Sequence, residues 1–183
     1  IIKSPGIPNT AEIVVAAKNK GIPVISEIEF ACRYTNATHV AITGTNGKTT
    51  TTRLIAHIAK TAGKKTGYTT SDGVYIQNQM MMKGDCTGPV SSTFVLKDPT
   101  VDFAVLECAR GGILKSGLAF QHCDVAIVTN VAADHIGLGG IYTVEQMAKV
   151  KAVVPETVFP HGYAILNAED ELVYKMKANL KCN

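Results

Sequence analysis

The chain contains no tryptophan, and aromatic residues make up only 6% of its 183 positions. It also carries little surplus charge, because 18 Lys and Arg against 15 Asp and Glu give a formal net charge of +3. These basic residues are scattered along the chain, whereas a nucleic-acid surface needs a basic patch or stripe. We therefore expect no nucleic-acid partner.

No apolar run approaches the roughly 20 residues that cross a bilayer, and no signal-peptide pattern opens the chain. The five cysteines are an odd number and include no C-x-x-C pair. Cys108 and Cys123 lie in apolar strand-like runs, where a reduced thiol behaves as a small hydrophobic side chain. We expect no disulfide framework, no membrane partner and a reducing, cytoplasmic location.

Strand-like and helix-like segments alternate along the chain. Gly73–Met82 has the pattern of a hairpin or an irregular excursion, and the alternation elsewhere predicts an α/β fold with a mostly parallel sheet and right-handed crossovers. Predicted strands are Ile22–Ile25, Val40–Thr43, Lys65–Thr70, Phe103–Glu107, Val125–Thr129 and Tyr163–Leu166. Predicted helices are Asn9–Lys20, Ser26–Tyr34, Lys48–Ala62, Ser91–Leu96 and Thr143–Val154.

A boundary between two parts of the chain is predicted at Asn36–Thr38, just before the strand that leads into a glycine-rich loop. The residues before it form only two short elements, which are too few for an independent core. Residues 1–38 are therefore expected to be the tail of an upstream domain, and residues 39–183 a nucleotide-binding domain. The chain starts at Ile1 and not at Met, which fits an excised fragment.

The strongest signal is the run G-T-N-G-K-T-T at Gly44–Thr50, between a predicted strand and a predicted helix. Glycines let backbone N–H groups approach phosphate oxygens, and the start of the helix favours the same anion. Lys48 is placed to reach the outer phosphates, and the Thr49 hydroxyl to bind Mg²⁺. A tight turn with an incidental lysine is the alternative, but the strand before and the helix after favour a phosphate loop.

Two polar motifs follow apolar strands and so are expected at the carboxyl edge of the sheet, where ligands bind. Glu107 ends the first strand, and from the residues alone it is either a metal ligand or the partner of Arg110. Asn130 opens the second motif, which ends in Asp134 and His135. A lone histidine is more often structural than a ligand, and Asp134 is suited to orienting its ring.

The shortened loop, with only two residues between Gly44 and Gly47, resembles that of the Mur ligase superfamily, a group of ATP-dependent amide-forming enzymes. The resemblance extends over about residues 40–170 and implies a P-loop NTPase-like central domain that uses ATP and two Mg²⁺ ions. It implies that Thr49 and Glu107 bind one ion and that His135 helps to bind the other. The nucleotide-binding set is then Gly44, Thr45, Asn46, Gly47, Lys48, Thr49, Thr50 and Asn130.

Members of this family also commonly carry a lysine carbamylated by CO₂ that holds the second metal. Lys149 and Lys151 both lie on the predicted helix after the Asp-His pair. Lys151 matches the family's K-A-x-x pattern better, whereas on the residues alone at least one of the two is a solvated helix lysine. Lys48, Glu107, His135 and Lys151 are the residues that the resemblance implies for catalysis.

Several further motifs are similar to the Mur-like domain of the cyanophycin synthetase family, which adds arginine to an aspartate side chain. They are Thr69–Ile76, Gly84–Pro89, Ala109–Leu114 and Asn130–His135, and Arg110-Gly111-Gly112 replaces the Ser-rich stretch of peptidoglycan ligases. Ser4–Pro8 and Gly21–Phe30 instead resemble the end of the N-terminal domain of D-glutamate-adding muramoyl ligases.

The resemblance predicts an ATP-dependent ligase that activates a carboxylate as an acyl phosphate before an amine attacks. Three alternatives stay open: a peptidoglycan precursor ligase joining UDP-N-acetylmuramoyl-L-alanine to D-glutamate, a non-catalytic nucleotide-binding module, and a kinase or NTPase with no amine acceptor. Family members carry a third domain after the stretch that corresponds to Asn167–Asp170. Because that domain is expected to be absent, the fragment is expected to bind ATP but to have little ligase activity alone.

Overall fold

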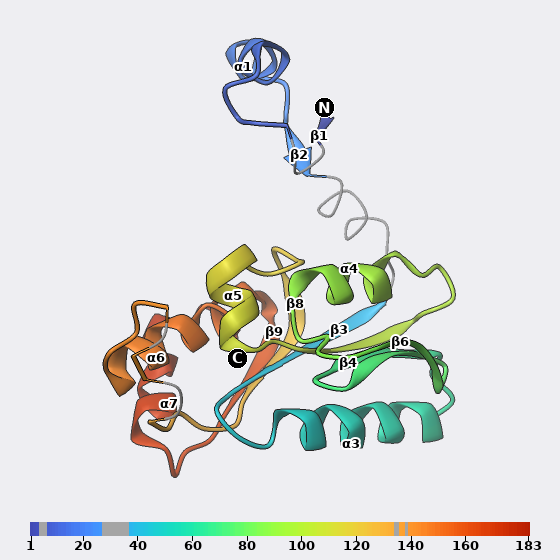
Figure 1. Ribbon diagram of the computed structural model, residues 1–183, viewed down its shortest axis with the longest axis vertical. Coiled ribbons are helices and arrows are strands. Elements are labelled where there is room, and N and C mark those ends of the chain that lie inside the picture. The colour runs from blue at the N-terminus through green and yellow to red at the C-terminus, as the bar shows by residue number, and fades with distance from the viewer. Residues whose placement is uncertain (4–6, 27–36, 134–135, 138) are drawn as a thin grey trace.

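The computed structural model describes residues 1–3, 7–26, 37–133, 136–137 and 139–183, and its elements are labelled in Figure 1. The strands are β1 (Ile2–Lys3), β2 (Ile25–Ser26), β3 (Thr38–Thr43), β4 (Thr66–Thr70), β5 (Gly73–Ile76), β6 (Gln79–Lys83), β7 (Phe103–Glu107), β8 (Cys123–Val128) and β9 (Val158–Leu166). The helices are α1 (Glu12–Asn19), α3 (Lys48–Thr61), α4 (Pro89–Lys97), α5 (Arg110–Ser116), α6 (Val144–Ala152) and α7 (Glu171–Lys175), with 3₁₀ turns η1 (Pro155–Thr157) and η2 (Met176–Asn179).

A seven-stranded sheet in the order β6-β5-β4-β7-β3-β8-β9 organises the fold. From β4 to β9 all neighbouring strands are parallel, and β5 and β6 add an antiparallel hairpin at one side. The predicted mostly parallel α/β sheet is therefore confirmed. The strand that leads into the glycine loop, β3, lies between β7 and β8, so the ends of these three strands lie side by side.

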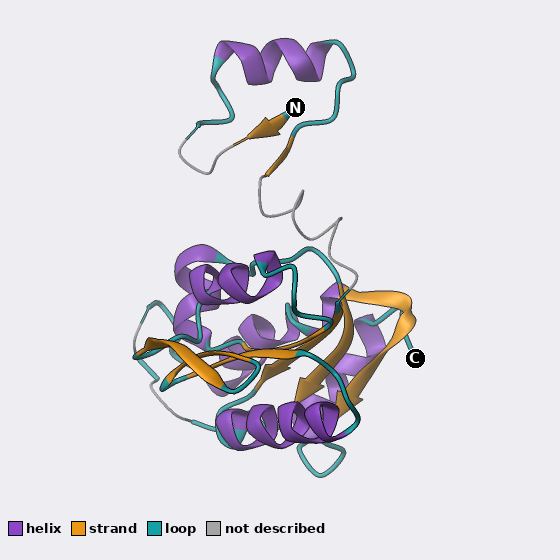
Figure 2. Ribbon diagram, turned by 90° about the vertical axis from the view of Figure 1, so that its right-hand side faces the viewer, coloured by secondary structure: helices purple, strands orange, loops and turns teal. Residues whose placement is uncertain are grey.

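Helices cover both faces of this sheet, with α3 on one face and α4 and α5 on the other (Figure 2). Alternate residues of β3 point to opposite faces, so Val40 and Ile42 belong to the cluster that includes Ala56 of α3. Ala41, between them, belongs to the cluster that includes Val95 of α4. Burial on both faces explains why the central strands are continuous apolar runs.

Helix α3 turns a narrow side of small residues toward the sheet: Thr52, Ala56 and Ala59 are its buried positions. Their spacing of four and three residues places them on one helical face. Small side chains let the helix backbone lie close to the strands, which fixes the position of its first turn. The predicted helix at Lys48–Ala62 is confirmed to within one residue.

The residues before the sheet form a small β–α–β unit in which β1 pairs with β2 in parallel. The predicted strand at Ile22–Ile25 is wrong over most of its length, since strand pairing begins only at Ile25. Pro23 explains this, because it has no N–H to donate to a neighbouring strand. The predicted helix at Ser26–Tyr34 lies outside the described residues, except for Ser26 at the end of β2.

Two short helices, α5 and α7, were not predicted from the sequence. Two of the seven positions of α5 are glycine, which disfavours helix, and no α5 residue is buried to give an apolar stripe. In the described part of the chain, no helix combines the length and apolar character needed to cross a bilayer.

Candidate functional site

The glycine loop joins the end of β3 to the start of α3 and has a shape that requires glycine. Gly44 has a φ of +145° and Gly47 a φ of +82°, values that L side chains rarely adopt. A Cβ atom at Gly44 would lie 1.9 Å from the Thr129 Oγ1 atom. Close contact with the end of β8 therefore excludes a side chain at Gly44.

Asn130 holds the loop from the neighbouring strand end. Its Oδ1 atom accepts hydrogen bonds from the backbone N–H of Thr45 at 3.1 Å and of Asn46 at 2.8 Å, and its Nδ2 donates to the Asn46 carbonyl at 3.2 Å. The backbone N–H groups of Thr45 and Asn46 are therefore already used in hydrogen bonds within the chain. An anion would instead meet the first turn of α3, which has no side-chain cap and whose N–H groups lack intrahelical partners.

Lys48 begins α3, and its ammonium group donates to the Thr45 carbonyl at 3.0 Å, so the side chain lies along the loop. A pocket of about 260 Å³ opens beside it. Side chains and backbone from the loop, from the start of α5 and from α6 line this pocket: Gly44, Thr45, Lys48, Ala109, Arg110, Gly111, Met147 and Lys151.

Thr49 and Glu107 meet directly next to the loop. The Thr49 hydroxyl donates to the Glu107 Oε2 atom at 2.8 Å, and Glu107, at the end of β7, is only 2% exposed. Burial raises the pKa of this carboxyl, although the Thr49 hydrogen bond and the nearby Lys48 ammonium work in the opposite direction. The described contacts of the Glu107 carboxylate do not include Arg110.

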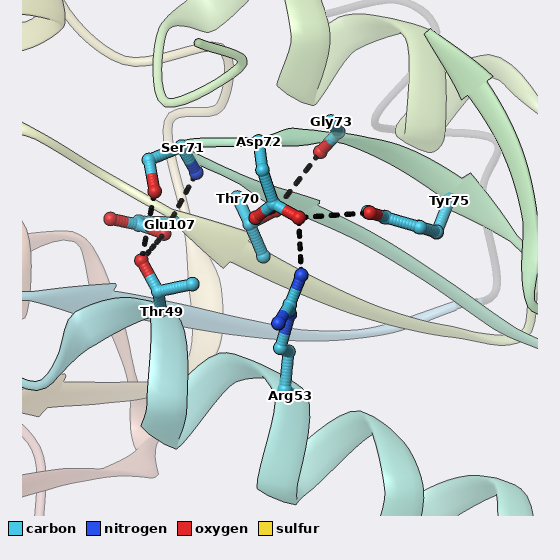
Figure 3. A network of polar contacts seen from close by, with 8 residues as sticks. All are labelled: Thr49, Arg53, Thr70, Ser71, Asp72, Gly73, Tyr75 and Glu107. Carbon is cyan, nitrogen blue, oxygen red and sulfur yellow. Dashed lines mark hydrogen bonds and ion pairs between the residues drawn. The ribbon is translucent and has the colours of Figure 1, made fainter. Parts of the chain in front are cut away.

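Ser71, just after β4, completes this group of oxygen atoms. Its backbone N–H donates to Glu107 Oε2 at 3.3 Å, and its hydroxyl lies 3.2 Å from the Thr49 hydroxyl (Figure 3). Hydroxyl and carboxylate oxygens are the ligands that Mg²⁺ accepts, usually one or two from protein and the rest from phosphate and water. The donor set therefore fits Mg²⁺. The described residues contain no cluster of three or more His, Cys, Asp and Glu.

The two candidate lysines of α6 lie in different surroundings. Lys149 is exposed, whereas Lys151 is 3% exposed, lines the pocket and donates from Nζ to the Gly44 carbonyl at 2.7 Å. Residues of α6 and of the loop, 107 positions apart in the sequence, are thereby joined. The other predicted ligand, His135, and its neighbour Asp134 lie outside the described residues.

Sequence reasoning did not identify Ser71 as a neighbour of the metal-binding pair, nor the polar network behind it. In that network Asp72 accepts hydrogen bonds from Thr70 and Tyr75 and forms an ion pair with Arg53 of α3 (Figure 3). The only signal was the T-S-D-G turn, which lies in the Thr69–Ile76 motif that resembles the cyanophycin synthetase family. The pairing of β4 with β7 places this turn next to Glu107, and the local sequence does not predict that strand order.

The family model and the curated relatives that match this chain agree on one family. The model of the Mur ligase middle domain matches residues 42–183. The cyanophycin synthetase of Geminocystis herdmanii is 63% identical over 142 residues, which are 78% of this chain but 16% of the relative. The UDP-N-acetylmuramoylalanine–D-glutamate ligase of Pelotomaculum thermopropionicum is 33% identical over 181 residues, 99% of this chain and 36% of the relative.

Solved structures agree on the fold. A UDP-N-acetylmuramoyl-L-alanyl-D-glutamate–2,6-diaminopimelate ligase superposes with a TM-score of 0.68 at 22% identity, over 97% of this chain and 42% of that one. A bifunctional folylpolyglutamate synthase/dihydrofolate synthase with Mn, AMPPNP and L-glutamate bound gives a TM-score of 0.61 at 24% identity, over 85% and 46%. The chain therefore spans less than half the length of each of these proteins.

Proposed function

The chain belongs to the Mur ligase middle-domain family, and we propose that it is the ATP-binding part of a carboxylate–amine ligase. The contact between Thr49 and Glu107 at the foot of a glycine loop carries this proposal, because it gathers a hydroxyl and a carboxylate where a bound triphosphate would end. The manganese and AMPPNP bound by the folylpolyglutamate synthase support the same nucleotide and metal chemistry.

In this proposal the loop residues Gly44–Thr50 hold the phosphates of ATP. The Lys48 ammonium neutralises the outer phosphates, and the N–H groups of the first turn of α3 donate to their oxygens. Asn130 acts through the loop, since its amide is bonded to the backbone of Thr45 and Asn46. Its part is to keep the loop in the shape that receives the nucleotide.

Two divalent ions are proposed, which neutralise negative charge on the transferring phosphoryl group when they are bound. Thr49 and Glu107 would hold the first, with Ser71 next to them. His135 and Lys151, carbamylated by CO₂, would hold the second. The burial of Lys151 and its place on the pocket support Lys151 over the exposed Lys149 for this modification.

The proposed reaction has two steps. An oxygen of the acid substrate attacks the γ-phosphorus of ATP, which releases ADP and forms an acyl phosphate. The amine nitrogen then attacks the acyl carbon and expels phosphate, and loss of a proton leaves the amide. The chain's own residues position the carboxylate and the phosphates in the pocket between Lys48 and Lys151.

For the substrates, we propose arginine and the side chain of aspartate in a growing peptide. The 63% identity to a cyanophycin synthetase supports this choice. A peptidoglycan precursor ligase that adds D-glutamate is the second candidate, because a D-glutamate ligase aligns with 99% of the chain, including the residues before β3. A non-catalytic nucleotide-binding module is the third.

We further propose that residues 1–38 are the end of an upstream domain and that residues 39–183 are the nucleotide-binding domain of a cytoplasmic protein. Full ligase activity would then need further domains, in line with the 16% of the cyanophycin synthetase that this chain matches. Efficient amide formation by residues 1–183 alone would contradict this part of the proposal.

Two measurements test the proposed function. Calorimetry of the chain should show ATP binding that Mg²⁺ strengthens and that Lys48→Ala weakens. With the longer protein, ADP release should require both an aspartate-containing peptide and arginine, and the control pair is UDP-N-acetylmuramoyl-L-alanine with D-glutamate. Equal ADP release with and without any acceptor would reject the ligase assignment, and turnover only with the control pair would select the second candidate.

A further inference from the structure

The first and second helical turns of α3 both contact the short loop between β4 and β5, which consists of Ser71 and Asp72. Thr49 lies at the first contact, with its hydroxyl 3.2 Å from the Ser71 hydroxyl. Arg53, four residues further along the same helical face, forms an ion pair with Asp72. Ser71 and Asp72 are thus attached to the helix side by side, as Figure 3 shows.

Asp72 is fixed by more than the ion pair. Its Oδ1 atom accepts the Thr70 hydroxyl at 2.7 Å, and its Oδ2 accepts the Tyr75 hydroxyl at 2.9 Å. The pKa of this carboxyl is lowered, first by the hydrogen bond from Thr70 and then by the hydrogen bond from Tyr75 and the positive charge of Arg53. Both oxygens of the side chain are therefore occupied, and its direction relative to the sheet is set from β4, from β5 and from α3.

The position of Ser71 follows from that of Asp72, because the two residues share a peptide bond. Ser71 in turn contacts both members of the proposed metal-binding pair, through its N–H to Glu107 and its hydroxyl to Thr49. A continuous path of contacts therefore leads from the side chains of Arg53 and Asp72 through Ser71 to the oxygens of the pair.

We propose that Arg53 and Asp72 are positioning residues that set the magnesium affinity of the nucleotide site by holding Ser71 against Thr49 and Glu107. This inference rests on the proposed function, since it concerns the metal of that same site. Arg53 and Asp72 are not among the residues that line the pocket beside Lys48, so their substitution should leave the metal-free binding of nucleotide unchanged. That separation distinguishes positioning from general support of the fold.

The test is a magnesium titration of AMPPNP binding to the full chain, followed by calorimetry, for the variants Arg53→Gln and Asp72→Asn. Loss of an outer hydrogen-bond partner costs a metal site about 10- to 100-fold in affinity, but this ion pair is half exposed, so we expect about three- to tenfold. The half-saturating Mg²⁺ concentration should rise by that factor, while AMPPNP affinity without Mg²⁺ stays within about twofold.

The matched control is Glu171→Gln, which removes the exposed ion pair between Glu171 and Lys175 on α7 and should leave the magnesium titration unchanged. In a Ser71→Ala background, Asp72→Asn should have a smaller effect than in the wild type, because Ser71 carries the coupling. If Asp72→Asn does not fold, Arg53→Gln still decides, since it changes only an exposed side chain of α3.

The outcomes separate the two proposals. If wild-type binding of AMPPNP ignores Mg²⁺, the proposed function itself fails. If the wild type depends on Mg²⁺ and both variants match it within twofold, the positioning role is overturned and the proposed function stands. If the variants weaken AMPPNP binding equally with and without Mg²⁺, Arg53 and Asp72 only support the fold, which also overturns the inference.

Discussion

The Thr49 hydroxyl donates to the Glu107 carboxylate across 2.8 Å, although 58 positions separate the two residues in the sequence. The contact exists because β3, which leads to Thr49, is the direct neighbour of β7, which ends at Glu107. The parallel pairing of β3 and β7 thereby places the start of α3 next to the end of β7.

Glu107→Gln should remove most of the magnesium dependence of nucleotide binding. The amide keeps the shape and the Thr49 contact but loses the negative charge that a divalent ion requires. We expect the affinity for Mg²⁺ with bound nucleotide to fall by at least about 100-fold, since even outer partners of metal ligands contribute 10- to 100-fold. Calorimetry with AMPPNP measures this, and a fall of less than threefold would exclude Glu107 as a ligand.

The same carboxyl predicts a pH dependence of stability without metal. Because burial raises its pKa, the folded state holds the Glu107 proton to a higher pH than the unfolded state does. Its contribution to the free energy of unfolding is therefore complete below the ordinary carboxyl pKa of 4.5 and is lost as the pH rises through the raised value. Urea unfolding across this range should give a steeper fall in wild type than in Glu107→Gln, and parallel curves would contradict the prediction.

Asn130→Ala should loosen the glycine loop. Three hydrogen bonds to Thr45 and Asn46 are lost, and each contributes about 1 kcal/mol, so the free energy of unfolding should fall by about 1–3 kcal/mol. Nucleotide affinity should fall about tenfold, because binding must then order the loop. Calorimetry and urea unfolding check the two effects.

Asn167→Ala is the matched control for that variant. Asn167 also joins neighbouring strand ends, donating to the Thr129 carbonyl at 3.0 Å, and its hydrogen bonds to described residues do not involve the loop Gly44–Thr50. It should lower stability without changing nucleotide affinity by more than about twofold. Equal losses of affinity in both variants would show that Asn130 has no special role in the loop.

Lys151→Met and Lys149→Met should differ sharply, although the two positions lie within one turn of α6. At Lys151 the change leaves the buried Gly44 carbonyl without its donor, which costs about 1–3 kcal/mol, and it removes the amine proposed for carbamylation. At exposed Lys149 the cost should stay within about 0.5 kcal/mol. Thermal unfolding and amide formation by the longer protein measure both, and similar losses would reject the distinction.

The sequence was sufficient to predict the central part of the fold for identifiable reasons. The strand over Phe103–Glu107 has the predicted bounds, because a continuous apolar run that ends in a charged residue is typical of a buried parallel strand. The bounds of α3 follow from the glycines at both of its ends. Cys108 and Cys123 were expected to be buried reduced thiols, and both are buried and free.

The parts that were not predicted depend on contacts between distant segments. Whether Glu107 faces Thr49 or Arg110 is decided by the order of strands in the sheet, and the local sequence fits either choice. The ion pair between Arg53 and Asp72 likewise joins a helix to a turn, and these two segments meet only because α3 packs against the sheet. Burial, which distinguishes Lys151 from Lys149, depends on how α6 packs and not on the spacing of the lysines.

The attachment of the glycine loop to Asn130 also has a consequence for how the protein is made. The amide of Asn46 bonds to a side chain 84 positions further along the chain, at the end of a strand that is synthesised much later. A nascent chain that has left the ribosome only as far as α3 contains every residue of the loop but not the partner that shapes it. The ability to capture nucleotide should therefore arise late during translation, once β8 has emerged and joined β3.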